Sequence, residues 1–284
     1  MEYIKTSDLL KYNIDRYDTF VRLLFLKNHN NWAIYKKMQI LRTKFNNKKP
    51  YHKYIRDFIK LENKFVNNNE IKPLTVNKNY KLLDGSHRFC LIIHNNIDKI
   101  PIQFKKENPK PYEKEWFVNN DFTHDEINMI DNMKSEIMNK YNLKIFSGFL
   151  WNPVYEKWDD ILNEFFIIVH KSVHNLTENK LIDIYKTDDV KISKIRNVKW
   201  KFLSKYGEQN NVNEKKFLYF QFVHEPNYRK KKNGNLICQN VEKIKKNIRQ
   251  KYKSHVDNYI YDVIIHICDN EDQNQKIEKI MINL

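Results

Sequence analysis

The chain has 284 residues, of which 41% are hydrophobic and 14% aromatic, so it can bury a sizeable core and is not a disordered chain. No apolar run approaches the roughly 20 residues of a membrane span, and the N-terminal residues lack the apolar core of a signal peptide, so we expect no membrane association and no secretion. The three cysteines are odd in number and far apart, which argues against a disulfide framework and predicts a cytoplasmic protein.

The formal net charge of +16 has two interpretations. It is typical of proteins with an anionic partner, such as nucleic acid, a phosphorylated small molecule or an acidic glycan. It also follows from a genome that favours Lys, Asn and Ile codons, because lysines are spread along the whole chain. The densest basic segments are residues 228–235 and 242–253.

The first part of the chain predicts helices followed by strands. Apolar residues recur at helical spacing over residues 7–45 and 53–68. Two short β-rich runs within residues 71–86 flank the turn sequence "NKN", and a short helix and a strand, "KIPIQF", follow.

The second part predicts a mixed α/β arrangement. The segment "KKENPKPYEKEW", with its two prolines and alternating charges, is expected to be a linker that divides the chain into domains 1–110 and 111–284. Helices are expected over 123–141, 155–165, 239–252 and 273–284, and strands over 144–151, 165–173, 216–223 and 258–268. The overall expectation is an α/β (α+β) fold in two domains.

The segment Asp84–Arg88, "DGSHR", lies between the strand "YKLLD" and the short helix. Gly85 permits a sharp turn, and a helix that starts at Ser86 presents unpaired N–H groups and the positive end of its dipole, which together favour an anion. Arg88 adds a forked cation and His87 a donor or a proton carrier. Asp84 is a candidate ligand of Mg²⁺ or acceptor of a hydroxyl proton. The alternative is an ordinary Asp-Gly turn with Ser86 as helix cap.

The stretch "PLTVNKNYKLLDGSHRFCLIIHNNIDKIPIQF" resembles the ParB/sulfiredoxin-like superfamily, in which a strand, a glycine-containing loop of this type, a helix and a second strand follow one another. The segment "LLDGSHR" is similar to the corresponding segment of the ParB-like free-serine kinases and related proteins. The resemblance implies that Gly85, Ser86, His87 and Arg88 bind nucleotide phosphates and that Asp84 is catalytic or associated with a metal. Position 86 is Ser where sulfiredoxins have their catalytic Cys, so the resemblance does not imply the sulfiredoxin reaction.

Upstream groups offer further candidates with two interpretations each. Glu62 and Glu70 are the nearest upstream carboxylates, and surface solvation is the simpler role for both. The cluster "RYDTFVR", with Arg16, Asp18 and Arg22, is either a wall that faces the loop or a helix start with an Asp18–Arg22 pair.

The second domain has its own candidates near the strand "YDVIIHI". Asp269 and Asn270 follow this strand, where ligands gather in α/β sheets, and Arg229, Lys230 and Arg249 are candidate partners of a substrate phosphate. Alternatively, Asp269 and Asn270 cap the last helix and the lysines form a solvated face. No zinc-ligand spacing is present, so His266 is expected to be an ordinary core histidine.

These observations favour a nucleotide-dependent phosphotransferase that uses ATP or another nucleotide with Mg²⁺ and acts on a hydroxyl of a small molecule such as an amino acid, a sugar or a glycan precursor. In this interpretation Asp84 and His87 are catalytic, Asp84 also serves the metal, and Gly85 to Arg88 hold the nucleotide. The alternative is a ParB-like nucleic-acid-binding or nucleotide-gated regulatory protein. It is not favoured, because no helix-turn-helix follows the DGSHR segment.

Overall fold

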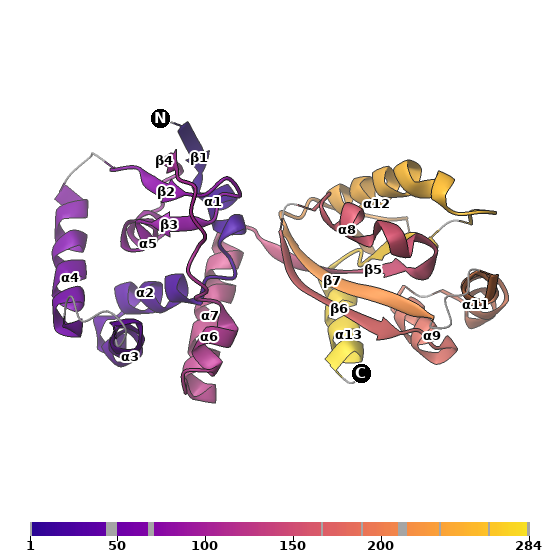
Figure 1. Ribbon diagram of the computed structural model, residues 1–284, viewed down its shortest axis with the longest axis horizontal. Coiled ribbons are helices and arrows are strands. Elements are labelled where there is room, and N and C mark those ends of the chain that lie inside the picture. Colours follow the sequence, from indigo (N-terminus) through magenta and orange to yellow (C-terminus); the bar gives the residue numbers. More distant parts are fainter. Residues whose placement is uncertain are drawn as a thin grey trace. The chain divides into compact units, whose positions relative to one another are not determined.

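The fold is mixed α/β, as expected, and consists of two compact units, Met1–Tyr141 and Asn142–Leu284 (Figure 1). This is a computed structural model that describes residues 2–43, 50–67, 71–165, 167–188, 190–209, 215–232, 234–260 and 262–282. We refer to the two parts as unit 1 and unit 2 and describe each by itself.

The division lies after Tyr141 and not near residue 110, where the prolines predicted a linker. The proline-rich segment instead packs onto unit 1: the Tyr17 N–H donates to the Tyr112 carbonyl over 2.9 Å. Helices α6 (Lys114–Val118) and α7 (His124–Lys140) follow it, and α7 packs against α2. The prolines and alternating charges therefore mark a loop that packs on the surface of unit 1, and not the boundary of that unit.

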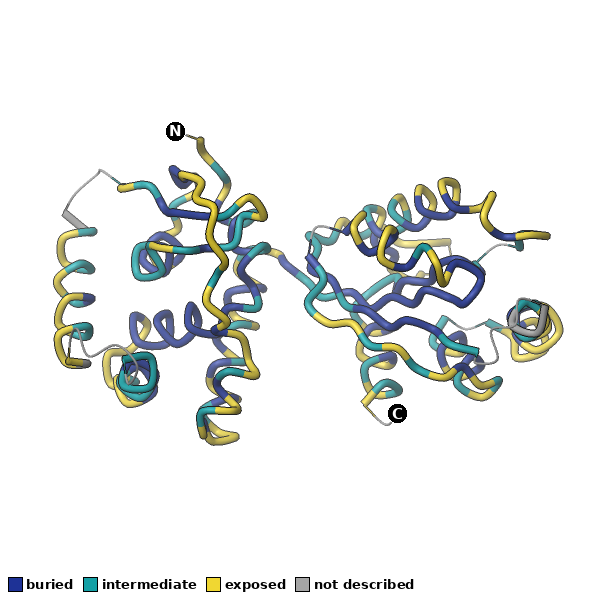
Figure 2. The backbone as a smooth tube through the Cα atoms, viewed as in Figure 1, coloured by how far each residue is buried: buried dark blue, intermediate teal, exposed yellow. Residues whose placement is uncertain are grey.

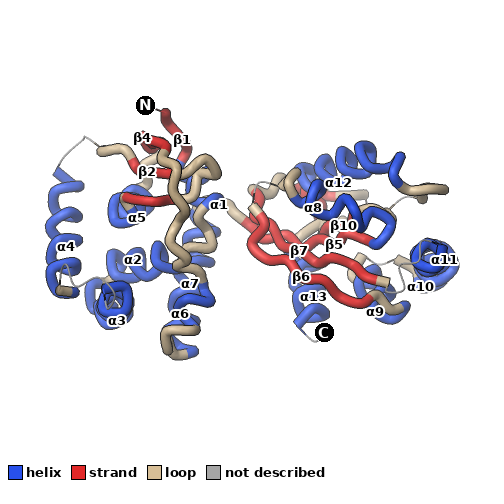
Figure 3. The backbone as a smooth tube through the Cα atoms, in the orientation of Figure 1, coloured by secondary structure: helices blue, strands red, loops and turns tan. Residues whose placement is uncertain are grey.

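Unit 1 contains a four-stranded sheet in the order β1-β4-β2-β3 (Figure 3). Strand β2 pairs in parallel with β4, while the β1–β4 and β2–β3 pairs are antiparallel. The strands are β1 (Glu2–Lys5), β2 (Leu74–Val76), β3 (Leu82–Asp84) and β4 (Lys99–Phe104). The predicted strands around "NKN" and at "KIPIQF" are confirmed, whereas β1 was not expected.

The most buried helix of unit 1 is α2 (Tyr17–Lys27), in which every residue but Lys27 is buried. It contacts α5 (Ser86–His94), α7 and α3 (Trp32–Thr43), so it has no face left for solvent. The other helices of the unit are α1 (Thr6–Tyr12), the short 3₁₀ helix η1 (His29–Asn31) and α4 (Tyr51–Asn67). Charged residues within α2 must therefore find their partners inside the protein.

Unit 2 contains an antiparallel sheet in the order β10-β5-β7-β6, with β6 at one edge. Its strands are β5 (Lys144–Trp151), β6 (Ile168–Asn175), β7 (Lys216–His224) and β10 (Ile265–Ile267). A separate hairpin is formed by β8 (Tyr228–Lys230) and β9 (Leu236–Cys238). Strand β10 is shorter than the expected 258–268, because Asn258 and Asp262 take left-handed backbone angles that bend the chain before it.

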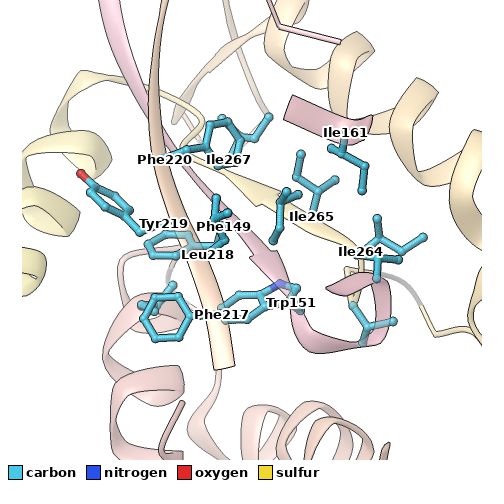
Figure 4. Close-up of a cluster of buried hydrophobic side chains, with 14 of the residues drawn as sticks. Phe149, Trp151, Ile161, Phe217, Leu218, Tyr219, Phe220, Ile264, Ile265 and Ile267 are labelled. Atoms are coloured by element: carbon cyan, nitrogen blue, oxygen red, sulfur yellow. The ribbon is translucent and has the colours of Figure 1, made fainter. Parts of the chain in front are cut away.

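The core of unit 2 is aromatic and lies on its central strands (Figure 4). Phe149 and Trp151 of β5 stack at 5.7 Å between ring centroids, and Phe217 of β7 lies beside both. The central strands are accordingly buried along most of their length (Figure 2).

Several helices surround this core. In Figure 1, α8 and α12 are drawn above the sheet and α9 and α13 below it. The helical elements of unit 2 are η2 (Asn152–Lys157), α8 (Trp158–Leu162), α9 (Glu178–Lys186), α10 (Ile192–Lys194), the π-helix η3 (Ile195–Trp200), α11 (Lys201–Gln209), α12 (Gln239–Tyr252), η4 (Lys253–His255) and α13 (Glu271–Ile282).

The three cysteines are free and fully buried, Cys90 in unit 1 and Cys238 and Cys268 in unit 2. Burial raises the pKa of the Cys90 thiol to about 12, against a smaller opposite effect of Arg22. None of the helices in the described ranges combines the length and the apolar character that a membrane crossing requires.

Candidate phosphate pocket

The DGSHR turn joins β3 to α5, and its glycine is required by its conformation. Gly85 has φ +93°, and a Cβ added to it would lie 2.6 Å from Leu74 Cδ2. Helix α5 begins at the next residue, and no side chain caps it. The first turn of a helix leaves backbone N–H groups without intrahelical acceptors, so this end of α5 can donate to a ligand.

Arg88 secures the turn. Its Nη1 donates to the carbonyls of Lys72 at 3.0 Å and Pro73 at 2.8 Å, and its Nη2 lies 3.3 Å from Asp84 Oδ2. The guanidinium therefore ties the start of α5 to the chain that enters β2. Arg88 was expected to bind phosphate, and the structure gives it a supporting role in the loop in addition.

The remaining residues of the motif differ in exposure. The Asp84 side chain is 79% exposed, whereas Ser86 and His87 are half-buried. His87 Nε2 lies 2.8 Å from the Tyr35 hydroxyl, and the His87 ring packs against Phe58 at 4.5 Å. The imidazole is thus held in place from the side of α3 and α4.

A pocket of about 320 Å³ opens at this turn. Its wall contains the whole DGSHR motif together with side chains from distant parts of unit 1: Arg16, Arg22, Arg42, Leu61, Leu83, Lys110 and Tyr112. Four arginines and one lysine line it, against the single carboxylate of Asp84. The site is therefore strongly cationic.

Beneath the pocket, the Asp18 carboxylate pairs with two of these arginines. Arg16 Nε and Nη2 each donate to it over 3.0 Å, and Arg22 Nη1 donates over 2.8 Å. Burial alone would raise the pKa of Asp18, but Arg16 and Arg22 outweigh burial and hold this pKa well below its ordinary value. Asp18 is thus a buried anion that two arginines share.

Arg22 keeps unused donors. Its side chain is fully buried, and its Nε and Nη2 have no hydrogen-bond partner within the described residues. An unpaired buried donor of a charged group carries a large free-energy cost. Because Arg22 lines the pocket, an anionic ligand there would supply the missing acceptor.

Arg42 adds a cation that no carboxylate of the described chain pairs with directly. Its guanidinium lies 4.5 Å from the centre of the Tyr112 ring. Burial, and then repulsion by Arg22, lower the pKa of Arg42 below its ordinary value. Two crowded guanidinium groups at one pocket are unfavourable unless an anion lies between or beside them.

The residues fit nucleotide phosphates, with Mg²⁺ as a companion ion. In the described ranges, no group of three or more His, Cys, Asp or Glu is arranged to hold a metal by itself. Mg²⁺ is usually held by one or two carboxylates together with phosphate oxygens and water, and Asp84 offers such a carboxylate at the pocket mouth.

Of the two upstream carboxylates, the structure describes Glu62. Glu62 Oε2 lies 3.1 Å from His29 Nε2 and does not line the pocket. Glu70 lies outside the described residues. The Asp18–Arg22 pair, one of the two interpretations given for its cluster, is present, and Arg16 and Arg22 of the same cluster also line the pocket beside the DGSHR loop.

The predicted substrate residues of the second domain lie in unit 2, where Lys230, Arg249, Asp269 and Asn270 line one pocket of about 750 Å³. Arg229 is exposed on β8 and is not part of that wall. Asn270 also caps α13, since its Oδ1 accepts from the Gln273 N–H over 2.9 Å.

The candidates expected from the sequence did not include Arg42, Lys110 or Tyr112, which come from α3 and from the presumed linker. Arg22 can be recognised from the sequence as an unusual residue, because it is a charged residue inside the apolar run "FVRLLFL". No protein-family model, curated protein or solved structure matches the chain.

Proposed function

We propose that unit 1 binds the phosphate groups of a nucleotide in the arginine-lined pocket, and that the chain transfers a phosphoryl group to a hydroxyl of a small molecule such as an amino acid, a sugar or a glycan precursor. The observation that carries this proposal is Arg22, which lines a pocket at the uncapped start of α5 and has two buried donors without a partner among the described residues. The resemblance of the DGSHR segment to nucleotide-binding loops supports it.

In this proposal each wall residue has a physical task. The α5 amides and the Arg22 and Arg42 guanidinium groups bind phosphate oxygens and offset their charge, which is the main requirement of phosphoryl transfer. Arg88 holds the loop in its shape through the Lys72 and Pro73 carbonyls. ATP supplies the phosphoryl group, and Mg²⁺, held through Asp84, supplies further charge neutralisation.

Asp84 and His87 are the two residues that would handle the acceptor proton. The exposed carboxylate of Asp84 can orient an incoming hydroxyl, since it lies at the mouth of the pocket and not in its floor. The bond to Tyr35 fixes the position of the His87 ring beside the phosphates. A neutral residue at position 84 would repel phosphate less than the Asp84 carboxylate does. An acid at this position therefore favours a catalytic role over phosphate binding alone.

The binding test uses the full chain and calorimetry with ATP, ADP, CTP and GTP, each with and without Mg²⁺. Arg42→Gln should weaken the best nucleotide by about 10- to 150-fold, the loss expected for a hydrogen bond to a charged group. Arg56→Gln is the matched control, because Arg56 is an exposed arginine of α4 outside this pocket. Equal affinities of the two variants would contradict the proposal.

Transfer is tested separately by ³¹P NMR with a metabolite mixture as acceptor. Appearance of a new phosphate ester that depends on Asp84 would support a phosphotransferase. Binding of DNA that weakens steeply with salt, with no nucleotide binding, would favour the nucleic-acid alternative instead.

A further inference from the structure

The larger pocket of unit 2 has a polar floor that the proposed function does not use. It has a volume of about 750 Å³ and lies between the end of α9, the β8–β9 hairpin, α12 and the start of α13. Protein pockets of this size usually hold small molecules and are lined mainly by apolar side chains. Here ionisable residues of β8, α12, β10, α13 and the loops beside them meet, which apolar burial does not explain.

Asp188 and His266 lie together in this pocket. Asp188 Oδ2 lies 3.3 Å from His266 Nε2, and His266 is only 4% exposed. Within the described residues, His266 Nε2 makes no hydrogen bond. Gln273 holds the other side of the pair, because its Nε2 donates to Asp188 Oδ1 and to Thr187 Oγ1. The sequence predicted an ordinary core histidine; His266 is buried, and it also has a half-buried carboxyl neighbour and, within the described residues, a nitrogen without a hydrogen-bond partner.

The protonation states of this pair suit a hydroxyl group. Burial, and then Asp269, raise the pKa of Asp188 to about 7, so this carboxyl is protonated below neutral pH. Burial, and then Lys245, lower the pKa of His266 to about 3, so the imidazole is neutral. A protonated carboxyl donates and a neutral imidazole nitrogen accepts, and a hydroxyl can satisfy both at once.

The other charged groups beside the pair are engaged in ion pairs with one another. Asp269 Oδ1 lies 2.6 Å from Lys245 Nζ, and Asp269 Oδ2 lies 2.8 Å from Lys231 Nζ. Asp262 pairs with Arg249 and, over 3.0 Å, with Lys199. These pairs explain why the predicted residues Arg249 and Asp269 are here, since they build the floor and hold β10 to α12.

Three charged side chains of the wall remain outside this network. Within the described residues, Lys230 of β8, Lys276 of α13 and Asp272 of α13 make no ion pair, and all three are exposed. Glu271 is already paired, 3.2 Å from Lys144 Nζ. These three side chains therefore give the mouth of the pocket one excess positive charge. The floor offers one donor, Asp188, and one acceptor, His266, to a hydroxyl group.

We propose that this pocket is a second ligand site that binds a polyhydroxylated carboxylic acid, with one hydroxyl in contact with both Asp188 and His266 and the carboxylate at Lys230 and Lys276. The many polar groups of the wall can satisfy further hydroxyls of such a ligand. The site lies wholly within unit 2 and does not depend on nucleotide binding by unit 1.

The test compares three probes with the full chain: gluconate, sorbitol and acetate. Sorbitol keeps the hydroxyls of gluconate and lacks its carboxylate, and acetate keeps only the carboxylate. We expect gluconate to bind most tightly by calorimetry and to shift the ¹H–¹³C NMR signals of the His266 ring, which the variant His266→Gln identifies. Gluconate that leaves these signals unmoved would overturn the proposal.

Variants separate the two ends of the ligand. Lys230→Gln and Lys276→Gln should each weaken gluconate by about two- to fivefold, as expected for exposed charge pairs, and leave sorbitol unchanged. Asp188→Asn should weaken both gluconate and sorbitol. Lys232→Gln, a neighbouring exposed lysine outside the wall, is the control. Equal effects of Lys230→Gln and Lys232→Gln would overturn the assignment of the carboxylate.

Discussion

Asp18 holds the Arg22 guanidinium from one side only: Oδ2 lies 2.8 Å from Nη1, while Nε and Nη2 have no acceptor within the described residues. A buried arginine is normally surrounded by acceptors, because its five N–H groups are expensive to leave unpaired. The half that lacks partners belongs to a residue of the pocket wall. We propose that an anion in the pocket supplies the acceptor that these two donors lack.

Replacing Arg22 by Lys should keep the pair with Asp18 and remove the fork that meets the ligand. We expect the folded chain to survive and nucleotide affinity to fall by about 10- to 100-fold, because Lys offers a point charge without the planar pair of donors. Calorimetry measures the affinity, and a thermal unfolding curve shows that the fold is kept. Parental affinity in a folded Arg22→Lys variant would remove Arg22 from the site.

Arg88→Ala should weaken nucleotide binding and also lower the free energy of unfolding by about 1–3 kcal/mol, since the Lys72 and Pro73 carbonyls lose their donor. Urea unfolding measures the stability. Arg88→Lys also tests whether the hydrogen bonds to these two carbonyls stabilise the fold. Unchanged stability of both variants would mean that water satisfies the two carbonyls.

Asp84→Asn should lower turnover by at least ~100-fold and leave nucleotide affinity and stability near parental values, as expected for loss of a base or metal ligand. The carboxylate is exposed, and its single ion pair with Arg88 is a long one of 3.3 Å, so little stability depends on it. ³¹P NMR follows the turnover. A variant as active as the parent would leave Asp84 with the role of a turn residue.

The carboxyl of Asp188 should make unit 2 less stable as pH rises. Its pKa in the folded state is about 7, above its ordinary value of 3.8, so its contribution to stability is fully present below about pH 4 and is lost as pH rises through 7. Asp188→Asn stays neutral at every pH. The variant should therefore gain about 1–3 kcal/mol over the parent between pH 5 and pH 8.

Urea unfolding at the two pH values measures this difference. The comparison with the parent cancels the titration of residues that both chains share, including Asp262, Asp269, Lys231 and Lys245 around Asp188. The same stability difference at pH 5 and pH 8 would show that Asp188 ionises as an exposed carboxyl does.

Much of the local structure follows from short-range patterns. Strand β5 and helix α12 were expected with the same bounds that the structure gives them, and Thr123 forms the capping box that starts α7. These signals are local, because hydrophobic period and cap residues act within a few positions. The bend before β10 depends on left-handed angles at Asn258 and Asp262, which periodicity does not reveal.

The candidate pocket was predictable only in part, for a physical reason. The DGSHR loop is one continuous segment, so its chemistry could be recognised as a motif. Arg42 and Tyr112 reach the same pocket from positions 70 residues apart in the chain, and only the packing of α3 and of the loop after β4 brings them together. Side chains that meet through tertiary packing leave no fixed spacing in the sequence.

Because all three cysteines are buried, their alkylation rates report how often the surrounding structure opens. A thiol that is fully enclosed cannot react with an alkylating reagent until its surroundings open. Cys90 sits in unit 1, and Cys238 and Cys268 in unit 2, so mass spectrometry of alkylated peptides reads the opening rate of each unit separately from one intact sample. A ligand that keeps one unit closed would slow the alkylation of the cysteines in that unit alone. The pattern of alkylation would therefore show which unit had bound the ligand.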